Sequence, residues 1–402
     1  MIIVLRGNIV AVVFAKRMNV MKASEIREIL KITQRPEVIS FAGGLPAPEL
    51  FPIEEMKQVA RIVLEESGSQ ALQYSTTEGF APLRQHIAQR MNRKFNTRIQ
   101  SDNILITSGS QQALDFSGKL FLNEGDIVLC ESPTYLAAIS AFKAYQPQFI
   151  EVPTDHEGMI IADLQRILEQ HDLIKLVYII PDFQNPTGRT WSIERRQQFV
   201  DVMSHYDIPV IEDNPYGELR FEGEIPPSIK SLDRTGNVIF VSTFSKTFCP
   251  GLRIGWIAAD QNLIEKYVLI KQGADLHTSS ISQREISKYL DLYDFDANIV
   301  KIIQVYRQRR NAILDAMESY FPDDIKFNRP QGGLFTWVEL PQHVKAVELL
   351  QSCLQQDVAF VPGDSFFPNR IVENTFRLNY SNMPEERIFE GIQRLAKAIK
   401  QV

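Results

Sequence analysis

Residues 242–248 read Ser-Thr-Phe-Ser-Lys-Thr-Phe and come directly after a strand-like run over residues 237–241. Lys246 therefore follows a predicted strand and stands among aromatic and hydroxyl side chains. Burial disfavours the charged ammonium form and lowers the pKa of the amine, which prepares it to attack an aldehyde and form a Schiff base. An ordinary surface lysine at the end of a strand is the alternative, so the residues that accompany Lys246 decide its role.

The composition describes a globular chain with a large core. Its 402 residues are 44% hydrophobic and 23% charged, with a formal net charge of -6, and this length favours two domains. The acidic balance and the lack of a run of lysines and arginines argue against a nucleic-acid surface. No apolar run approaches the length of a membrane span. We therefore expect small-molecule partners, with no nucleic acid and no membrane.

The cysteines and histidines predict neither a disulfide framework nor a metal site. The three cysteines are odd in number and widely spaced: Cys130, Cys249 and Cys353. The six histidines show no paired spacing of the kind that binds zinc. This cysteine usage favours a reducing compartment, and we predict a cytoplasmic protein without a bound metal.

The first 20 residues predict an N-terminal arm. Arg6 precedes an apolar run over residues 9–15, which faintly resembles a signal peptide. Two basic residues, Lys16 and Arg17, interrupt this run, and no small-residue cleavage pattern follows it. An arm, or an overextended start, is the prediction.

Between residues 60 and 300, short apolar runs alternate with longer amphipathic segments, which is typical of a sheet wrapped by helices. The predicted strands are residues 103–107, 126–130, 176–180, 209–211, 238–241 and 253–259. The predicted helices are residues 82–94, 110–121, 135–145 and 193–205, the last with Ser192 as its N-cap.

The pattern changes after residue 300 and predicts a second, smaller α+β domain. A helix over residues 299–320 precedes strands at 335–340, 358–361 and 375–380, and the N-terminal part adds a helix at 22–31 and a strand at 39–41. We predict an arm over residues 1–20, a large domain over 61–299, and a small domain made of 21–60 and 300–402.

Ligands of open α/β sheets bind beyond the carboxyl ends of the strands, so polar residues at these ends are candidates for a site. After the first predicted strand, Gly109-Ser110-Gln111 opens a helix whose free N–H groups could bind an anion such as phosphate; a plain turn capped by Ser110 is the alternative. After the second, Tyr135 could stack on a flat cofactor or simply pack in the core.

The next two strand ends supply an amide and a carboxylate. Asn185 begins an Asn-Pro-Thr-Gly turn that presents its side chain rigidly. Asp213 ends an apolar strand, where ionisation is unfavourable unless a cation or a proton donor meets it. A pyridinium nitrogen would be such a partner, and the ring would then serve as an electron sink, with Tyr216 donating to its phenolic oxygen. An ordinary pair between Asp213 and an arginine is the alternative.

Two arginines suit anionic partners. Arg253 lies seven residues after Lys246 and could pair with a phosphate, to which Thr243 and Ser245 could add hydroxyl contacts. Arg377 lies in an apolar strand, and its planar guanidinium suits an α-carboxylate, with an internal salt bridge as the alternative.

Together these motifs resemble the class I aminotransferases of pyridoxal phosphate fold type I, over residues 41–380. The chain is most similar to the branch that holds the 2-aminoadipate and kynurenine/aminoadipate aminotransferases, through residues 43–49, 72–75 and 271–277. The resemblance implies an α/β fold, with a mostly parallel seven-stranded sheet sandwiched by helices and a smaller α+β domain.

The resemblance also implies roles for individual residues. Lys246 would form the internal aldimine with pyridoxal 5'-phosphate and shuttle protons, and Asp213 would meet the ring nitrogen. The implied cofactor contacts are Asn185 and Tyr216 to the ring oxygen, Tyr135 stacked on the ring, and Ser110, Gln111, Thr243, Ser245 and Arg253 around the phosphate. Thr243 departs from the serine of many relatives but keeps the hydroxyl. Arg377, with Asn185 and Gly44 beside it, would bind the substrate α-carboxylate.

Two further implied roles concern the subunit partner and the substrate. Tyr74 would reach the phosphate of a neighbouring subunit, which implies a homodimer with shared active sites. Arg27 would meet the distal carboxylate of an acidic substrate, although a helix-surface pair with Glu25 or Glu28 is equally open.

The implied reaction is ping-pong transamination from an L-amino acid to a 2-oxo acid such as 2-oxoglutarate. The donor would be 2-aminoadipate, leucine, an aromatic amino acid or a similar one. A lyase or decarboxylase of the same fold is one alternative. The effector domain of a transcription regulator is another, but it needs a winged-helix segment ahead of the domain, and we expect none from the few residues before position 22.

Overall fold

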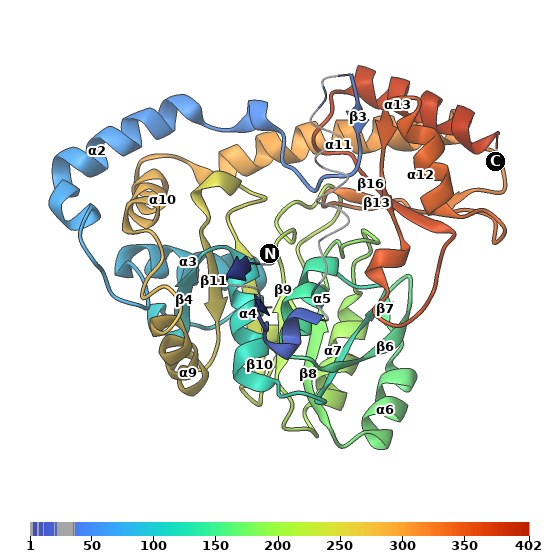
Figure 1. The fold of residues 1–402 in the computed structure, drawn as a ribbon. Coiled ribbons are helices and arrows are strands. Elements are labelled where there is room, and N and C mark those ends of the chain that lie inside the picture. The colour runs from blue at the N-terminus through green and yellow to red at the C-terminus, as the bar shows by residue number, and fades with distance from the viewer. Residues whose placement is uncertain are drawn as a thin grey trace.

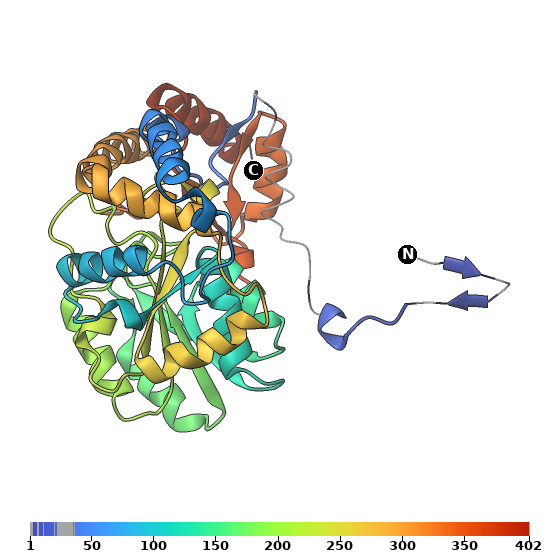
Figure 2. The same ribbon diagram turned by 90° about the vertical axis from the view of Figure 1, so that its left-hand side faces the viewer.

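The computed structural model describes residues 3–5, 8–10, 12–19, 21, 35 and 37–401. The helix predicted over residues 22–31, and with it Arg27, lies outside the described residues. The N-terminal part that is described contains a short hairpin of β1 (Ile3–Leu5) and β2 (Asn8–Val10). Figure 2 shows this hairpin standing away from the body of the molecule, and residues 12–19 are exposed.

An eight-stranded sheet forms the centre of the large half of the molecule (Figure 1). In spatial order its strands are β4 (Ile104–Thr107), β11 (Gly255–Ala258), β10 (Val238–Thr243), β9 (Val210–Asp213), β8 (Ile174–Ile179), β5 (Ile127–Ser132), β6 (Gln148–Asp155) and β7 (Gly158–Met159). All pairs are parallel except those of β11 with both its neighbours and of β7 with β6. All six strands named from the sequence are confirmed. Two strands of the sheet, β6 and β7, were not named from the sequence, and the two-residue β7 makes the sheet eight-stranded rather than the expected seven-stranded.

Helices cover both faces of this sheet because its strands bury side chains in both directions. These helices are α3 (Ala81–Phe95), α4 (Ser110–Phe121), α5 (Leu136–Lys143), α6 (Ile161–Gln170), α7 (Ile193–Met203), α8 (Ile229–Leu232), α9 (Gln261–Gln272) and α10 (Ser280–Leu292), and α2 (Ile53–Ala71) packs on α10. Ser192 caps α7 as predicted, its side chain accepting a hydrogen bond from the N–H of Arg195.

The side chains of β8 alternate between the two faces of the sheet and show which helices cover each face. Leu176 and Tyr178 pack in the cluster formed with α4, α5 and α9, whereas Val177 and Ile179 pack with α6 and α7. Successive side chains of a strand point to opposite faces of the sheet. Side chains two residues apart therefore share a face, which matters for the polar residues at the strand ends.

A smaller antiparallel sheet lies beside the large one. Its order is β12 (Lys326–Phe327), β13 (Phe335–Glu339), β16 (Thr375–Asn379) and β15 (Val361–Pro362). β14 (Val358–Ala359) pairs instead with β3 (Ile39–Ser40). The single strand predicted over residues 358–361 was therefore wrong, because Phe360 separates two short strands that belong to different sheets. The helices α11 (Phe295–Tyr320), α12 (Ala346–Leu354) and α13 (Glu385–Ile399) pack here.

Short 3-10 helices occur between these elements. They are η1 (Lys16–Asn19), η2 (Pro48–Leu50), η3 (Ser101–Asn103), η4 (Pro250–Leu252) and η5 (Asp364–Phe366). Among the described residues, no helix has the length and apolar character that crossing a membrane requires.

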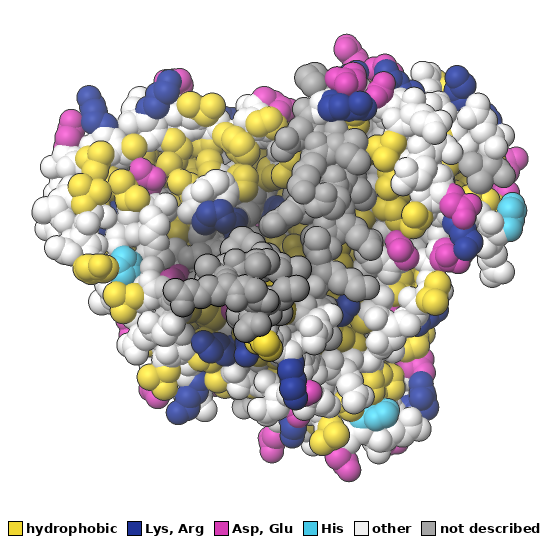
Figure 3. All heavy atoms as spheres, in the orientation of Figure 1, with side chains coloured by type: hydrophobic (Ala, Val, Ile, Leu, Met, Phe, Trp, Pro, Cys, Tyr) yellow, Lys and Arg dark blue, Asp and Glu magenta, His cyan; other side chains and the backbone are white. Residues whose placement is uncertain are grey.

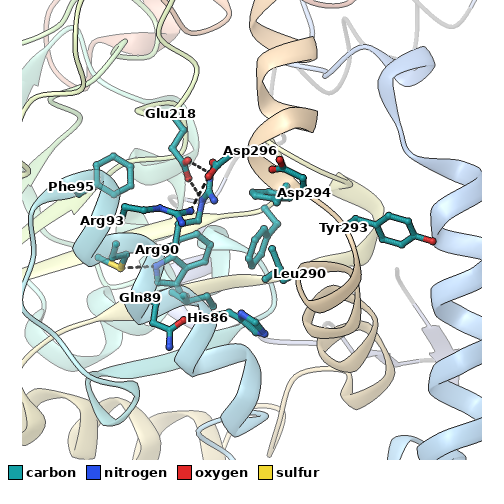
Figure 4. Close-up of a pocket in the computed structure, with 15 residues that line it drawn as sticks. His86, Gln89, Arg90, Arg93, Phe95, Glu218, Leu290, Tyr293, Asp294 and Asp296 are labelled. Carbon is teal, nitrogen blue, oxygen red and sulfur yellow. Dashed lines mark hydrogen bonds and ion pairs between the residues drawn. The ribbon is translucent and has the colours of Figure 1, made fainter.

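The start of α11 is anchored to the large half by a charged cluster (Figure 4). Arg90 of α3 donates from Nε to Glu218 at 2.8 Å and from Nη2 to Asp296 at 2.8 Å, and its guanidinium lies 4.6 Å from the ring centre of Phe295. Arg90 and Glu218 are both largely buried. Breaking such a buried pair leaves an unpaired charge, so the cluster fixes where α11 leaves the large half.

Candidate active site

A cavity of about 170 Å³ lies at the carboxyl ends of β5, β8, β9 and β10. Its wall is made of Ser110, Gln111, Tyr135, Ile180, Asn185, Asp213, Pro215, Tyr216, Thr243, Ser245, Lys246, Pro250 and Arg253. These residues come from segments far apart in the sequence. Every residue predicted to touch the cofactor lines this cavity except Tyr74, and the position at the strand ends is the expected one.

Lys246 reaches the cavity from the loop that follows β10. Its Nζ donates a hydrogen bond to the carbonyl oxygen of Gly44 at 2.8 Å. Burial lowers the pKa of Lys246 to about 8, and the nearby cations of Arg377 and Arg253 act in the same direction. The side chain is therefore held in the site, and the alternative of an ordinary surface lysine was wrong. The amine loses its proton more readily than an exposed lysine.

Asp213 ends β9 with one carboxylate oxygen satisfied and the other not. Its Oδ2 accepts a hydrogen bond from the hydroxyl of Tyr178 at 2.8 Å. Its Oδ1 is buried and has no partner, and Asp213 pairs with no arginine of the described residues. Burial raises the pKa of this carboxyl to about 7. An unpaired buried oxygen is rare, so Asp213 is suited to a cationic or proton-donating group in the cavity.

The turn before α4 is shaped to bind an anion. The N-cap of α4 is Gly109, with φ at +74°, and no side chain caps the helix. Ser110 is the first helical residue, so its predicted alternative as N-cap was wrong. A Cβ on Gly109 would lie 2.4 Å from Arg253 Nη2, and one on Gly255 would lie 2.7 Å from the N atom of Ser110. Only glycine permits this close approach. The free N–H groups at the start of α4 and the guanidinium of Arg253 therefore face the same point, where an anion would bind.

Hydroxyl groups lie beside this turn and add hydrogen-bonding groups for an anion. Thr243 Oγ1 accepts from the N–H of Ser245 at 3.1 Å and contacts the carbonyl oxygen of Ile254 at 3.0 Å. Ser245 Oγ accepts from Arg253 Nη1 at 3.3 Å. Gln111 donates from Nε2 to the carbonyl oxygen of Ala137 at 3.1 Å. A phosphate would find charge, hydroxyls and backbone donors together here.

A fully buried lysine supports this turn from behind. Lys271 Nζ contacts Gln112 Oε1 at 3.1 Å, Asp275 Oδ1 at 2.8 Å and Thr278 Oγ1 at 2.9 Å. Gln112 Oε1 in turn accepts from the N–H of Ser108 at 2.8 Å. Sequence reasoning used residues 271–277 only as a resemblance. The Lys-x-x-x-Asp spacing at the end of α9 was the signal that could have revealed the ion pair.

Arg377 lies on β16, almost completely buried, and has no ion-pair partner among the described residues. Its Nη1 donates to Asn185 Oδ1 at 2.8 Å and its Nη2 to the carbonyl oxygen of Ala42 at 2.6 Å, while Nε has no partner. The guanidinium lies 4.2 Å from the ring centre of Phe335. Burial lowers the pKa of Arg377 to about 10. The predicted alternative, an internal salt bridge, was therefore wrong, and the arginine is available to an anion.

The contact with Arg377 also orients Asn185. Because Asn185 Oδ1 accepts from the guanidinium, its Nδ2 remains as a donor for a group in the cavity. Tyr216, on the loop after β9, is buried with its ring edge-on to Phe335 at 5.8 Å between centres. Burial raises the pKa of Tyr216 and also raises that of Tyr135 to about 12, so both phenols keep their protons.

Asp182, buried on the loop that carries Asn185, forms an ion pair with α7 and a hydrogen bond to the loop that carries Tyr216, and sequence reasoning missed both. Arg196 Nη2 donates to Asp182 Oδ1 at 2.7 Å, with both side chains fully buried. Asn214 Nδ2 donates to Asp182 Oδ2 at 2.9 Å, and Asn214 Oδ1 accepts from the N–H of Gly217 at 2.9 Å. No local pattern predicted this pair, because Asp182 and Arg196 belong to different elements.

Within the described residues, Tyr74 is the predicted cofactor contact that lies outside this cavity. Tyr74 is 80% exposed and contacts His277 edge-on, with 5.9 Å between ring centres. Arg27 lies outside the described residues. Gly44 contributes its carbonyl oxygen to Lys246, as described above. Within the described part of the chain, no group of three or more histidine, cysteine or acidic side chains could hold a metal ion.

Comparison with known proteins identifies the family. The model of the class I and II aminotransferases matches residues 37–395. The chain belongs to this family. The aminotransferase is 47% identical to aromatic-amino-acid aminotransferase 1 of Thermococcus litoralis, over 96% of this chain and 94% of the relative. It is 42% identical to the 2-aminoadipate transaminase of Thermus thermophilus, over 96% of both chains.

A solved structure agrees with these relatives. The crystal structure of Pyrococcus horikoshii kynurenine aminotransferase, in complex with PMP, KYN as substrates and KYA as products, is similar with a TM-score of 0.93 and 43% identity. The similarity covers 96% of this chain and 97% of that one. The predicted resemblance, the fold type I architecture and the pyridoxal phosphate cofactor are confirmed. The aminotransferase therefore transfers amino groups with pyridoxal phosphate as its cofactor.

Proposed function

We propose that the cavity around Lys246 is the centre at which this aminotransferase moves an amino group from an L-amino acid to a 2-oxo acid. One observation carries the proposal. A lysine with a lowered pKa shares the cavity with the unpaired buried oxygen of Asp213. An amine that can react at neutral pH and a carboxylate in need of a cation are the two groups that pyridoxal phosphate requires from a protein.

The residues present fit the cofactor. The turn before α4, with Arg253, Thr243 and Ser245, suits its phosphate, and Asp213 suits its ring nitrogen. Asn185 Nδ2 and the Tyr216 hydroxyl are donors for the ring oxygen, and Tyr135 supplies a ring to stack against the cofactor. When bound, pyridoxal phosphate supplies an aldehyde that condenses with amines and a ring that withdraws electrons from the substrate Cα.

Lys246 serves as the proton carrier in this proposal. Its pKa of about 8 means that about a tenth of the amine is neutral at pH 7, far more than for an ordinary lysine, and this form can accept a proton from the substrate Cα. The Gly44 carbonyl accepts a hydrogen bond from the same nitrogen and fixes its position. The chain thus supplies the base in the place where the proton is released.

Arg377 binds the α-carboxylate, which amino acids and 2-oxo acids have in common. A single carboxylate site therefore serves the donor and the acceptor in turn, as a ping-pong reaction requires. We propose 2-oxoglutarate with glutamate as one pair. For the other amino donor we propose 2-aminoadipate, leucine or an aromatic amino acid, supported by relatives named for aromatic amino acids and 2-aminoadipate.

A panel of amino donors tests the proposal. Purified enzyme with pyridoxal phosphate is incubated with each donor and 2-oxoglutarate, and glutamate and the new 2-oxo acid are measured together. Equal amounts of the two products support transamination. Release of carbon dioxide or of an elimination product that does not require 2-oxoglutarate would instead identify a decarboxylase or a lyase.

Arg27→Ala tests whether Arg27 lets the enzyme accept acidic amino donors such as 2-aminoadipate. If Arg27 meets a distal carboxylate, the variant should lose about 10-fold to 100-fold in kcat/KM for 2-aminoadipate, because an ion pair to the substrate is lost. Leucine has no distal carboxylate, so its kcat/KM in the same variant is the control. Equal values for Arg27→Ala and wild type on 2-aminoadipate would exclude Arg27 as a substrate contact.

A homodimer with shared active sites is also part of the proposal. Hydrophobic side chains gather over α2 in Figure 3, and the exposed ones on α2 and the residues after it include Ile53, Leu64, Leu72 and Tyr74. Exposed apolar patches of this kind mark protein interfaces. Light scattering coupled to gel filtration should give twice the chain mass of 46.0 kDa. A mass of one chain would contradict both the dimer and the role of Tyr74.

The proposed location and organisation follow from the same features. A cytoplasmic location is supported by Cys130, Cys249 and Cys353, all of which are free thiols. The proposed division into a large domain at 61–299, a small domain at 21–60 and 300–402, and an arm at 1–20 is supported by the separation of the eight-stranded sheet from the four-stranded sheet.

A further inference from the structure

We infer that Tyr178 is a positioning residue that holds one oxygen of Asp213 so that the other oxygen faces the cofactor ring. This inference rests on the proposed role of Asp213 and extends it to a side chain outside the cavity wall. Tyr178 is 1% exposed and does not line the cavity. It therefore touches neither substrate nor cofactor and acts through Asp213.

The strand register brings the two residues together. Tyr178 of β8 is the parallel partner of Ile211 of β9, and Asp213 lies two residues further along β9. Tyr178 and Ile211 pack in the same core cluster, and a spacing of two residues keeps Asp213 on that face of the sheet. A tyrosine is long enough to span this diagonal, and its hydroxyl donates to Asp213 Oδ2 at 2.8 Å.

Within the described residues, the hydrogen bond from Tyr178 sets the orientation of the Asp213 carboxylate. Among the described residues, Tyr178 is the one donor to the side-chain carboxylate of Asp213: it donates to Oδ2, and Oδ1 has no partner. The phenol is itself fixed by the ring of Phe142, which lies edge-on with 5.8 Å between ring centres. Fixing Oδ2 from one side leaves Oδ1 as the oxygen available to a group in the cavity.

The hydrogen bond also favours the charged form of the carboxyl. Burial raises the pKa of Asp213, and the hydroxyl of Tyr178 acts in the opposite direction. Because the phenol is buried beside a carboxylate, its own pKa is well above the usual value, so it remains a donor. The other titratable groups around Asp213 are Glu131, Tyr135, Tyr216, Lys246, Arg253 and Arg377. None of them makes a hydrogen bond to Asp213.

Tyr178→Phe removes one hydroxyl and leaves the ring. The matched control is Tyr267→Phe, because Tyr267 is buried in the same core cluster and shares a 2.8 Å hydrogen bond with the neutral Ser117. We expect Tyr178→Phe to weaken pyridoxal phosphate binding by about 10-fold to 100-fold, the effect of losing a hydrogen bond to a charged group. Tyr267→Phe should bind the cofactor as the wild type does. Cofactor affinity is measured by titrating the visible absorbance of the bound form.

A pH profile of kcat provides the second measurement. Without its donor, Asp213 becomes harder to ionise, so its carboxylate is lost at a higher pH. The acid limb should therefore move up by about one pH unit in Tyr178→Phe and stay in place in Tyr267→Phe. If both variants give the same affinity and the same acid limb, Tyr178 does not position Asp213 and the inference is overturned.

Asp213→Asn closes a double-mutant cycle. If Tyr178 acts through Asp213, adding Tyr178→Phe to Asp213→Asn should cause little further loss of cofactor affinity. A full additional loss would show that Tyr178 acts elsewhere and would overturn the inference. A wild-type enzyme that takes up no cofactor, measured in the same titration, would instead overturn the proposed role of the whole cavity and this inference with it.

Discussion

Lys246→Ala is expected to abolish amino transfer, with kcat falling by at least about 10⁴-fold, the upper end of what a positioned proton-transfer group contributes. Lys246 is the one lysine in the wall of the described cavity, and alanine leaves neither a nucleophile for the cofactor aldehyde nor a base for the substrate Cα. The visible absorbance band of the bound cofactor should disappear as well. Product formation from the most active donor of the panel measures the first effect and spectroscopy the second.

Lys266→Ala is the matched control, since Lys266 is exposed on α9 and lies outside this cavity. It should keep both the absorbance band and the activity. Borohydride reduction of the wild-type enzyme followed by peptide mass spectrometry should find a pyridoxyl group on Lys246. A Lys246→Ala enzyme that retains the band and turns over substrate would end the assignment of this lysine.

Arg377→Lys is expected to lower kcat/KM for amino donors and oxo-acid acceptors alike, by about 30-fold to 5000-fold. This range corresponds to the loss of about 2–5 kcal/mol when one partner of a buried charged hydrogen bond is truncated. Lysine keeps the charge but lacks the planar fork that binds a carboxylate at two points. Because both substrates carry an α-carboxylate, initial rates measured with each substrate varied in turn should show the same direction of change.

The cofactor provides the internal control for Arg377→Lys. Arg377 faces the substrate position, so the variant should still develop the visible band when pyridoxal phosphate is added. Arg394→Lys, on the outer helix α13, should leave all rates unchanged. A loss confined to one of the two substrates would argue against a common carboxylate site.

Much of the large half could be predicted from the sequence because its signals are local. The strands β4, β5, β9 and β10 each begin with a short apolar run and end on polar residues, and every residue in them is buried. Such a pattern gives the strand and also the position of the side chain beyond its end. The residues Ser110, Tyr135, Asp213 and Lys246 were found in this way.

The small half was harder to predict because its strands are short and depend on distant partners. The run at 358–361 reads as one strand, yet β14 pairs with β3 while β15 pairs with β16. The partner of such a short strand depends on which other strand the tertiary fold places next to it. In the large sheet, β6 and β7 were not named from the sequence, and the two residues of β7 carry no periodicity.

The sequence by itself indicated Lys246, Asp213 and the glycine turn before α4 as candidates for the site and determined the family that combines them, because each depends on residue type and on neighbours along the chain. The tertiary structure decided which of these side chains have partners. Among the described residues, Arg377 has no carboxylate partner and Asp213 Oδ1 has no hydrogen-bond donor. Tyr178 and Lys271 pack behind the site. Hydrogen bonds between residues far apart in the chain depend on strand register and packing, which no local pattern encodes.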